Sequence, residues 1–238
     1  MGFIITIALL VILSLSIWTG FRRGLIRGIA SLVAVIIALI GSNAAASRYS
    51  QEIIPALDPF IGGYIDSESN IDEILTRLGY GGTELSLRDI LEQDTSLRYD
   101  YAYESIRSIG FYGDVAEDLA QDAVGYAQRT GTDLTESIIL ILCNTIAYVG
   151  CITVVFIMIL ILLSAIMDML NIDFHLPNID MVDEVAGAAL GFVKGFVYCV
   201  LLCWLLGFLG LIIGRNTCQD TVLVNFFLVF RFLTQMLI

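Results

Sequence analysis

Charged residues and histidine are scarce in this chain, and long apolar stretches are abundant. Only 15% of its residues are charged and 58% are hydrophobic, whereas about a quarter of the residues in ordinary soluble domains are charged. Four stretches approach or exceed the roughly 17–25 apolar residues needed to cross a bilayer, namely residues 2–18, 24–46, 138–167 and 185–214. The composition excludes an ordinary soluble domain. It predicts an all-α polytopic membrane protein with four transmembrane helices.

The residues that build metal sites and catalytic centres are also few. The single histidine, His175, belongs to no HExxH pattern and has no nucleophile motif around it. The cysteines lie within or directly after apolar stretches: Cys143, Cys151, Cys199, Cys203 and Cys218. A disulfide framework is not expected among lipid-facing thiols, which we interpret as small hydrophobic residues in helix packing. We therefore predict no catalytic site, no cofactor and no metal.

Acidic residues are missing from the central part of every apolar stretch. Proton- or sodium-coupled transporters usually place ionisable groups at mid-membrane, so coupled transport is not expected. Four aspartates lie together in the segment between the third and fourth stretches: Asp168, Asp173, Asp180 and Asp183. We expect them to cap helices and to be solvated in the turn rather than to form a catalytic carboxylate pair.

Basic residues are absent before the first apolar stretch and frequent after it. This order is the reverse of a cleaved secretory signal, so residues 1–18 are expected to stay as a span. Arg22, Arg23 and Arg27 follow directly, and basic residues in short loops remain in the cytoplasm. The N-terminus and residues 47–137 are therefore predicted to be extracytoplasmic.

Most of the acidic residues lie in the segment between the second and third apolar stretches. Residues 47–137 hold 18 acidic and 6 basic residues, and the rest of the chain holds 6 of each. Such a surface argues against binding to nucleic acid or to anionic lipid headgroups. Four capping patterns predict helix starts, at Asn70, Ser86, Asp114 and Asp133, and Gly131 predicts a helix end. We expect a small helical extracytoplasmic insert.

Two nine-residue motifs place glycine at every fourth position. They are GFRRGLIRG at residues 20–28 and GAALGFVKG at residues 187–195, with 167 residues between equivalent positions. Residues four apart share a helix face, and glycines there allow close packing of helices in lipid. The glycines predicted to pack helices are Gly20, Gly24, Gly28, Gly187, Gly191 and Gly195. Each copy follows an apolar span and a turn, so the repeat predicts two parallel-repeat hairpins.

Basic residues accompany both glycine motifs. Lys194 occupies the position that Arg27 occupies in the first copy. Basic side chains at the cytoplasmic end of a span anchor it among the headgroups. Arg22, Arg23, Arg27 and Lys194 are therefore predicted to be cytoplasmic anchors.

The C-terminal stretch TVLVNFFLVFRFLTQMLI is interrupted by Asn225, Arg231 and Gln235. An amphipathic interfacial helix on the outer leaflet fits this pattern better than a fifth span, which remains the alternative. The predicted organisation has four parts. They are hairpin 1 (1–46), the acidic insert (47–137), hairpin 2 (138–214) and the interfacial tail (215–238).

The order RRGLIRGIASLV, DEVAGAALGFVKG and Phe-rich tail resembles the colicin V production protein family over residues 1–46 and 138–238. The positions that carry the resemblance are Arg23, Gly24, Arg27, Asp183, Gly187, Gly191, Lys194 and Gly195. The resemblance implies a bacterial inner-membrane protein with four spans, from a family named for supporting the export of a peptide toxin. The chain departs from the family in having Gly28 where an acid is frequent, and in lacking an aspartate within MGFIITIALL.

Two hypotheses of function follow from these observations. The first is a non-catalytic protein, accessory to envelope function or peptide toxin export, that binds envelope or secretion proteins through its insert and tail. The alternative is an oligomeric passive channel with its pore between subunits, since four glycine-packed helices leave little room for a lumen. The lipid bilayer is a partner in both, and a homo-oligomer is required by the second.

Overall fold

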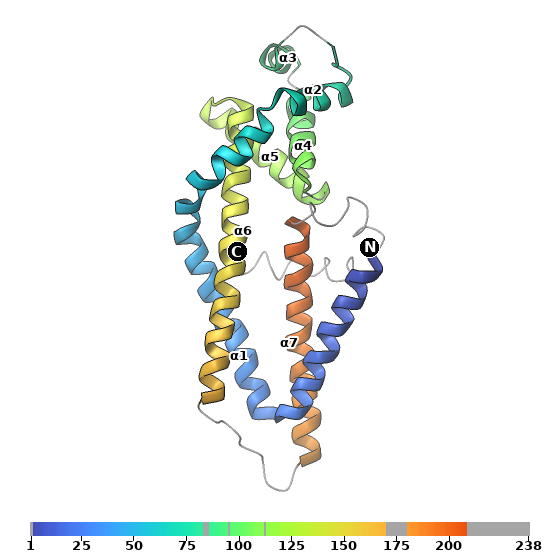
Figure 1. Ribbon diagram of the computed structural model, residues 1–238, viewed down its shortest axis with the longest axis vertical. Coiled ribbons are helices and arrows are strands. Elements are labelled where there is room, and N and C mark those ends of the chain that lie inside the picture. The colour runs from blue at the N-terminus through green and yellow to red at the C-terminus, as the bar shows by residue number, and fades with distance from the viewer. Residues whose placement is uncertain (1, 83–85, 95, 112, 170–179, 209–238) are drawn as a thin grey trace. The chain divides into compact units, whose positions relative to one another are not determined.

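The computed structural model describes residues 2–82, 86–94, 96–111, 113–169 and 180–208, and these residues form helices without a strand. The helices are α1 (Gly2–Ile65), α2 (Glu68–Arg77), α3 (Leu87–Gln93), α4 (Leu97–Ile109), α5 (Gly113–Thr130), α6 (Leu134–Met169) and α7 (Asp180–Phe208) (Figure 1). The prediction of an all-α chain is confirmed. His175, Asp173, Cys218 and the predicted interfacial tail lie outside the described residues.

The chain divides into two compact units. The first, here called the membrane unit, contains Met1–Arg48 and Gly150–Leu206, together with Ile213–Ile238. The second, called the acidic unit, contains Tyr49–Val149 and Gly207–Ile212. Each unit is described by itself below.

Within the described residues, three helices are long and apolar enough to cross a membrane. They are Ile5–Ile65 of α1, Leu134–Met169 of α6 and Met181–Leu205 of α7. In the membrane unit, α6 exposes large apolar side chains, among them Val154, Ile157, Met158, Ile161 and Leu162. Such a continuous apolar surface suits contact with lipid. The prediction of a membrane protein is confirmed.

Helix α1 contains the first two predicted spans and is kinked between them. Gly24 has φ 71° and ψ 180°, a conformation that is essentially restricted to glycine. We call residues 2–23 arm 1 and residues 25–65 arm 2. In Figure 1 the chain reverses its direction between the two arms. A backbone conformation that only glycine adopts easily therefore makes the turn inside the first glycine motif.

Arm 2 runs further than the sequence indicates. The second apolar stretch ends at Ala46, but the helix continues to Ile65 and includes Pro55 and Pro59. Ile61 and Ile65 lie one turn apart on the same helix face, and both are buried in the core of the acidic unit. Burial of this face offsets the loss of the backbone hydrogen bonds that the prolines cannot donate.

The acidic unit has a core of its own. Its fully buried side chains include Ile65, Ile74, Tyr101, Ile106, Ile138 and Leu142. Helix α4, which packs against α5 and α2, contributes Tyr101, and burial raises the pKa of this phenol above its ordinary value. Helix α5 buries Leu119 and Ala123, as its amphipathic pattern predicts.

The helix ends of the acidic unit test the predicted caps. The Ser86 hydroxyl accepts a hydrogen bond from the Asp89 backbone N–H at 3.3 Å, so this cap is confirmed. Gly131 directly follows α5 with φ 70°, which confirms the predicted helix end. The cap at Asn70 is wrong, because α2 begins at Glu68 and Asn70 is buried within it. An acidic residue in the first turn, Glu68, favours the earlier start through the helix dipole.

Replacing Ser86 with alanine is expected to loosen α3. Loss of a capping side chain costs about 1 kcal/mol, which corresponds to an approximately fivefold fall in the protection of α3 amides against hydrogen exchange. Ser67→Ala is the matched control. Ser67 occupies the equivalent position before α2, but its side chain forms no capping hydrogen bond with that helix. Equal loss of protection in the two helices would contradict the role of the Ser86 hydroxyl.

Candidate glycine crossing and basic cavity

The two glycine motifs meet one another in the membrane unit. A Cβ atom built on Gly20 would lie 2.8 Å from the Cα of Gly191, and closer still to the carbonyl oxygen of Gly187. A Cβ built on Gly191 would lie 3.1 Å from the Cα of Gly20. These atoms belong to the backbone of the opposite helix, which cannot move aside as a flexible side chain can. Arm 1 and α7 are therefore in backbone contact, the arrangement that glycines allow between helices in lipid.

The contact between arm 1 and α7 is antiparallel. A Cβ on Gly187 would lie 3.0 Å from the Cα of Gly24, whereas a Cβ on Gly195 would lie 3.4 Å from the Cα of Leu13. Partners on arm 1 thus move toward the N-terminus as α7 advances. A Cβ built on Gly28 would meet a side chain of α7, that of Leu190, at 2.9 Å.

Asp183 of α7 holds the start of arm 2. Its carboxylate Oδ1 accepts a hydrogen bond from the backbone N–H of Leu25 at 2.9 Å. The first N–H groups of a helix have no partner within it, so Asp183 of α7 caps the N-terminus of arm 2. Its negative charge also suits the positive end of the helix dipole. Asp183 does cap a helix, but it is only 6% exposed and not solvated as expected.

Gly24 makes room for this cap. A Cβ at position 24 would overlap the Asp183 carboxylate and lie 3.0 Å from its Cγ. The same glycine therefore supplies both the backbone conformation of the kink and the space for the carboxylate that stabilises it.

Arg27 joins arm 2 to the end of α6. Its guanidinium donates to the carboxylate of Asp168 at 2.7 Å. The Asp168 side chain is largely exposed, so the pair contributes at most about 1 kcal/mol. The sequence contains no local signal for this pair.

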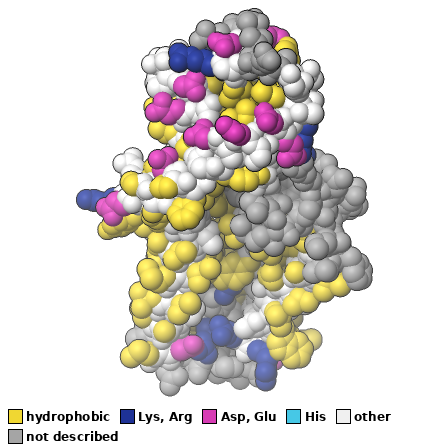
Figure 2. Space-filling view, turned by 45° about the horizontal axis from the view of Figure 1, so that its top comes forward, with side chains coloured by type: hydrophobic (Ala, Val, Ile, Leu, Met, Phe, Trp, Pro, Cys, Tyr) yellow, Lys and Arg dark blue, Asp and Glu magenta, His cyan; other side chains and the backbone are white. Residues whose placement is uncertain are grey.

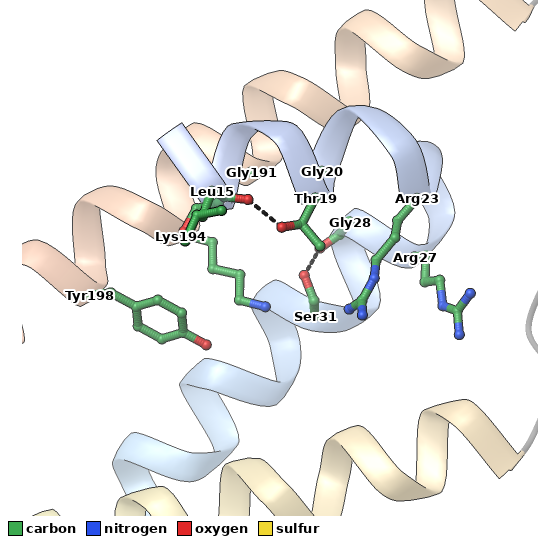
Figure 3. A pocket seen from close by; sticks show the side chains of 11 residues that line it. Leu15, Thr19, Gly20, Arg23, Arg27, Gly28, Ser31, Gly191, Lys194 and Tyr198 are labelled. Atoms are coloured by element: carbon green, nitrogen blue, oxygen red, sulfur yellow. Dashed lines mark hydrogen bonds between the residues drawn. The ribbon is translucent and has the colours of Figure 1, made fainter. Parts of the chain in front are cut away.

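Three of the four predicted anchors, Arg23, Arg27 and Lys194, line a cavity of about 160 Å³. Arg23 is exposed at the surface and also lines the cavity, whereas Arg22 is exposed and does not line it. Lys194 is half-buried, with its Nζ 5.5 Å from the centre of the Tyr198 ring, a cation–π distance. The motifs predicted these cations, but their convergence on one cavity arises only when the helices pack (Figure 3).

The cysteines of the described residues are buried and form no disulfide: Cys143, Cys151, Cys199 and Cys203. The Cys199 thiol lies 3.6 Å from the carbonyl oxygen of Leu9 on arm 1. Their burial agrees with the interpretation of these cysteines as small hydrophobic residues. Within the described ranges, three or more His, Cys, Asp or Glu side chains do not gather in an arrangement that could hold a metal ion.

Asp183→Ala is expected to destabilise the membrane unit by about 1–3 kcal/mol, because it leaves the partly buried Leu25 N–H without its acceptor. Asp183→Asn retains a side-chain oxygen and is expected to cost less. Thermal unfolding in mild detergent measures the difference. Glu184→Ala is the control, since Glu184 is the adjacent acid and is exposed. If both alanine variants unfold at the same temperature, the cap contributes nothing to stability.

The sequence model described as colicin V production protein matches residues 5–76 and 111–231. The match includes both glycine motifs and Asp183, and it extends into both ends of the acidic insert, which the resemblance was expected to omit. The stretch between the matched parts, residues 77–110, contains α3 and α4. No curated protein and no solved structure matches the chain. Since the match covers well over half of the sequence, the chain belongs to the colicin V production protein family.

Proposed function

We propose that this chain is a non-catalytic protein of the bacterial inner membrane that supports envelope function or peptide toxin export by binding other proteins. The observation that carries the proposal is the acidic unit, a folded helical domain with its own core and a strongly charged surface. A domain that served only to connect two spans would need neither.

The charge of the acidic unit favours a basic protein partner. Residues 49–149 hold 18 acidic and 5 basic residues, and Figure 2 shows acidic side chains gathered over this part of the surface. Helix α5 buries Ala116 and Ala120 while it exposes Glu117, Asp118 and Asp122. Complementary charge across an interface raises the association rate and selects the partner.

The proposed topology has four spans in two hairpins, formed by the two arms of α1, by α6 and by α7. Arg22, Arg23 and Arg27 adjoin the kink and are placed in the cytoplasm by the positive-inside tendency. The N-terminus and the acidic unit then lie outside, with the C-terminal tail on the outer leaflet. This places the acidic surface where it can meet envelope or secretion proteins.

Reversing charge on α5 tests the proposal. The host is a bacterium that carries the colicin V genes and lacks its own family member. In it, Asp118→Lys with Asp122→Lys is expected to lower secreted toxin about tenfold or more, because like charges juxtaposed at an interface cost several kcal/mol. Glu52→Lys with Asp58→Lys is the matched control, with the same charge change on exposed positions of arm 2. The amount of protein in the membrane is measured in parallel.

Two results would contradict the proposal. One is unchanged secretion by the α5 variant at wild-type membrane levels. The other is a closed ring of several copies, seen by native mass spectrometry in mild detergent, that also conducts ions in liposomes. The second result would establish the channel instead.

A further inference from the structure

Seven of the eleven residues that line the cavity between arm 1, the start of arm 2 and α7 have polar side chains. The polar side chains come from Ser16, Thr19, Arg23, Arg27, Ser31, Lys194 and Tyr198. Its volume of about 160 Å³ exceeds the roughly 30 Å³ of a single water molecule several times over. The cavity therefore has room for a small polyatomic group.

The lining of the cavity is positively charged. Among the described residues that line it are three cations, Arg23, Arg27 and Lys194, and no carboxylate. Arg27 is paired with Asp168, which lies outside the lining. Within the part of the chain that the structure describes, neither Arg23 nor Lys194 forms an ion pair. Among the described residues, two cations of the cavity thus have no ion-pair partner.

Arg23 and Lys194 approach the same space from different helices. Figure 3 shows their charged ends on either side of Ser31, while Arg27 points away. Like charges that face one cavity repel one another, and a bound anion between them offsets the repulsion. The lining also brings the hydroxyls of Ser16 and Tyr198 to the cavity, which adds neutral hydrogen-bond donors to the charged ones.

This set of donors matches a phosphate group. An arginine guanidinium presents a planar fork that pairs with two oxygens of phosphate, and a lysine ammonium acts as a point charge with three donors. A tetrahedral phosphate can accept from both cations and from a hydroxyl at the same time. Basic cavities between spans at one membrane face bind phospholipid headgroups in this way.

An apolar strip leads from the cavity along arm 1. Leu15 lines the cavity and is 59% exposed, and Val11, one turn earlier, is 48% exposed. Residues four apart lie on the same helix face, so acyl chains attached to a phosphate in the cavity could continue along these side chains.

We propose that this cavity is a phosphate-binding site, with Arg23 and Lys194 as its charged ligands. The phosphate is carried by an anionic phospholipid or by a free phosphate compound. The apolar strip is the feature that suits the lipid, and the following measurements distinguish the two sources.

Native mass spectrometry of the full chain in mild detergent tests the site. Phosphatidylglycerol is titrated, and diacylglycerol with the same acyl chains serves as the phosphate-free comparison. The first is expected to bind and the second is not. Arg23→Ala and Lys194→Met are each expected to reduce bound phosphatidylglycerol about fivefold, the effect of one cation near an anionic lipid. Lys194→Arg, which keeps the charge, is expected to retain binding.

Arg22→Ala is the matched control, because Arg22 is adjacent to Arg23 and exposed but does not line the cavity. Inorganic phosphate is added in a separate titration. If it raises the unfolding temperature of the wild type but not of Arg23→Ala, and displaces the lipid, the site serves a free phosphate. If the lipid binds and phosphate does neither, the site serves a headgroup. Equal lipid binding by the Arg22 and Arg23 variants, without phosphate binding, overturns the proposal.

Discussion

Gly24→Ala is expected to be among the most damaging single-methyl changes in the membrane unit. The glycine conformation with φ 71° and ψ 180° costs any other residue about 1–3 kcal/mol. The added Cβ also overlaps the Asp183 carboxylate and displaces the cap of arm 2. The two effects together are expected to remove about 3 kcal/mol of stability, which lowers the unfolding temperature by roughly 6–12 °C for a chain of this size.

A double-mutant cycle separates the two effects of Gly24→Ala. In an Asp183→Gly background the carboxylate is absent, so only the backbone strain of the substitution remains. The cost of Gly24→Ala is then expected to be smaller than in the wild type, and the difference measures the coupling between the two residues. Strict additivity in this cycle would show that the kink and the carboxylate are independent.

Gly191→Ala is expected to force arm 1 and α7 apart. Its Cβ would lie 3.1 Å from the Cα of Gly20 and against the backbone carbonyl of Ser16, and overpacking of this kind typically costs about 1–3 kcal/mol. The measurement is the unfolding temperature in mild detergent, supported by helix crosslinking between arm 1 and α7.

Gly150→Ala provides the matched control for Gly191→Ala. Gly150 lies within α6, and a Cβ built there meets no atom within 4 Å. Alanine is favoured over glycine inside a helix by up to about 1 kcal/mol, so this variant is expected to be neutral or slightly more stable. Destabilisation of both variants to the same extent would show that the loss at Gly191 has another cause than helix contact.

The sequence predicted most of the helical architecture because its strongest signals are local. The described residues of the apolar stretches that begin near residues 2, 24, 138 and 185 lie in helices, and Ser86 and Gly131 mark helix ends where their chemistry requires. Helix α4 was not predicted. Its buried residues contact α5 and α2, and helices of this length are stabilised mainly by such packing rather than by their own sequence.

The candidate site was only partly predictable, because its contacts join segments far apart in the chain while the sequence signals are local. A four-residue repeat identifies the helix face that carries the glycines, but it does not say which other face will meet it. The structure brings the two copies together in antiparallel contact. The pairing of Asp183 with Leu25 and that of Arg27 with Asp168 join positions far apart in the chain, and no local pattern contains both members of either pair.

The cap at the Gly24 kink has a consequence for biogenesis. Leu25 and Asp183 are 158 residues apart, and ribosomes add roughly 5–20 residues per second. Asp183 is therefore synthesised about 10–30 s after Leu25, an interval derived from that rate. During this time the Leu25 N–H lacks the acceptor that Asp183 supplies in the folded chain. Ribosome stalling before codon 183 would lengthen this interval and, with it, the time for which proteases and insertion factors can act on the uncapped helix.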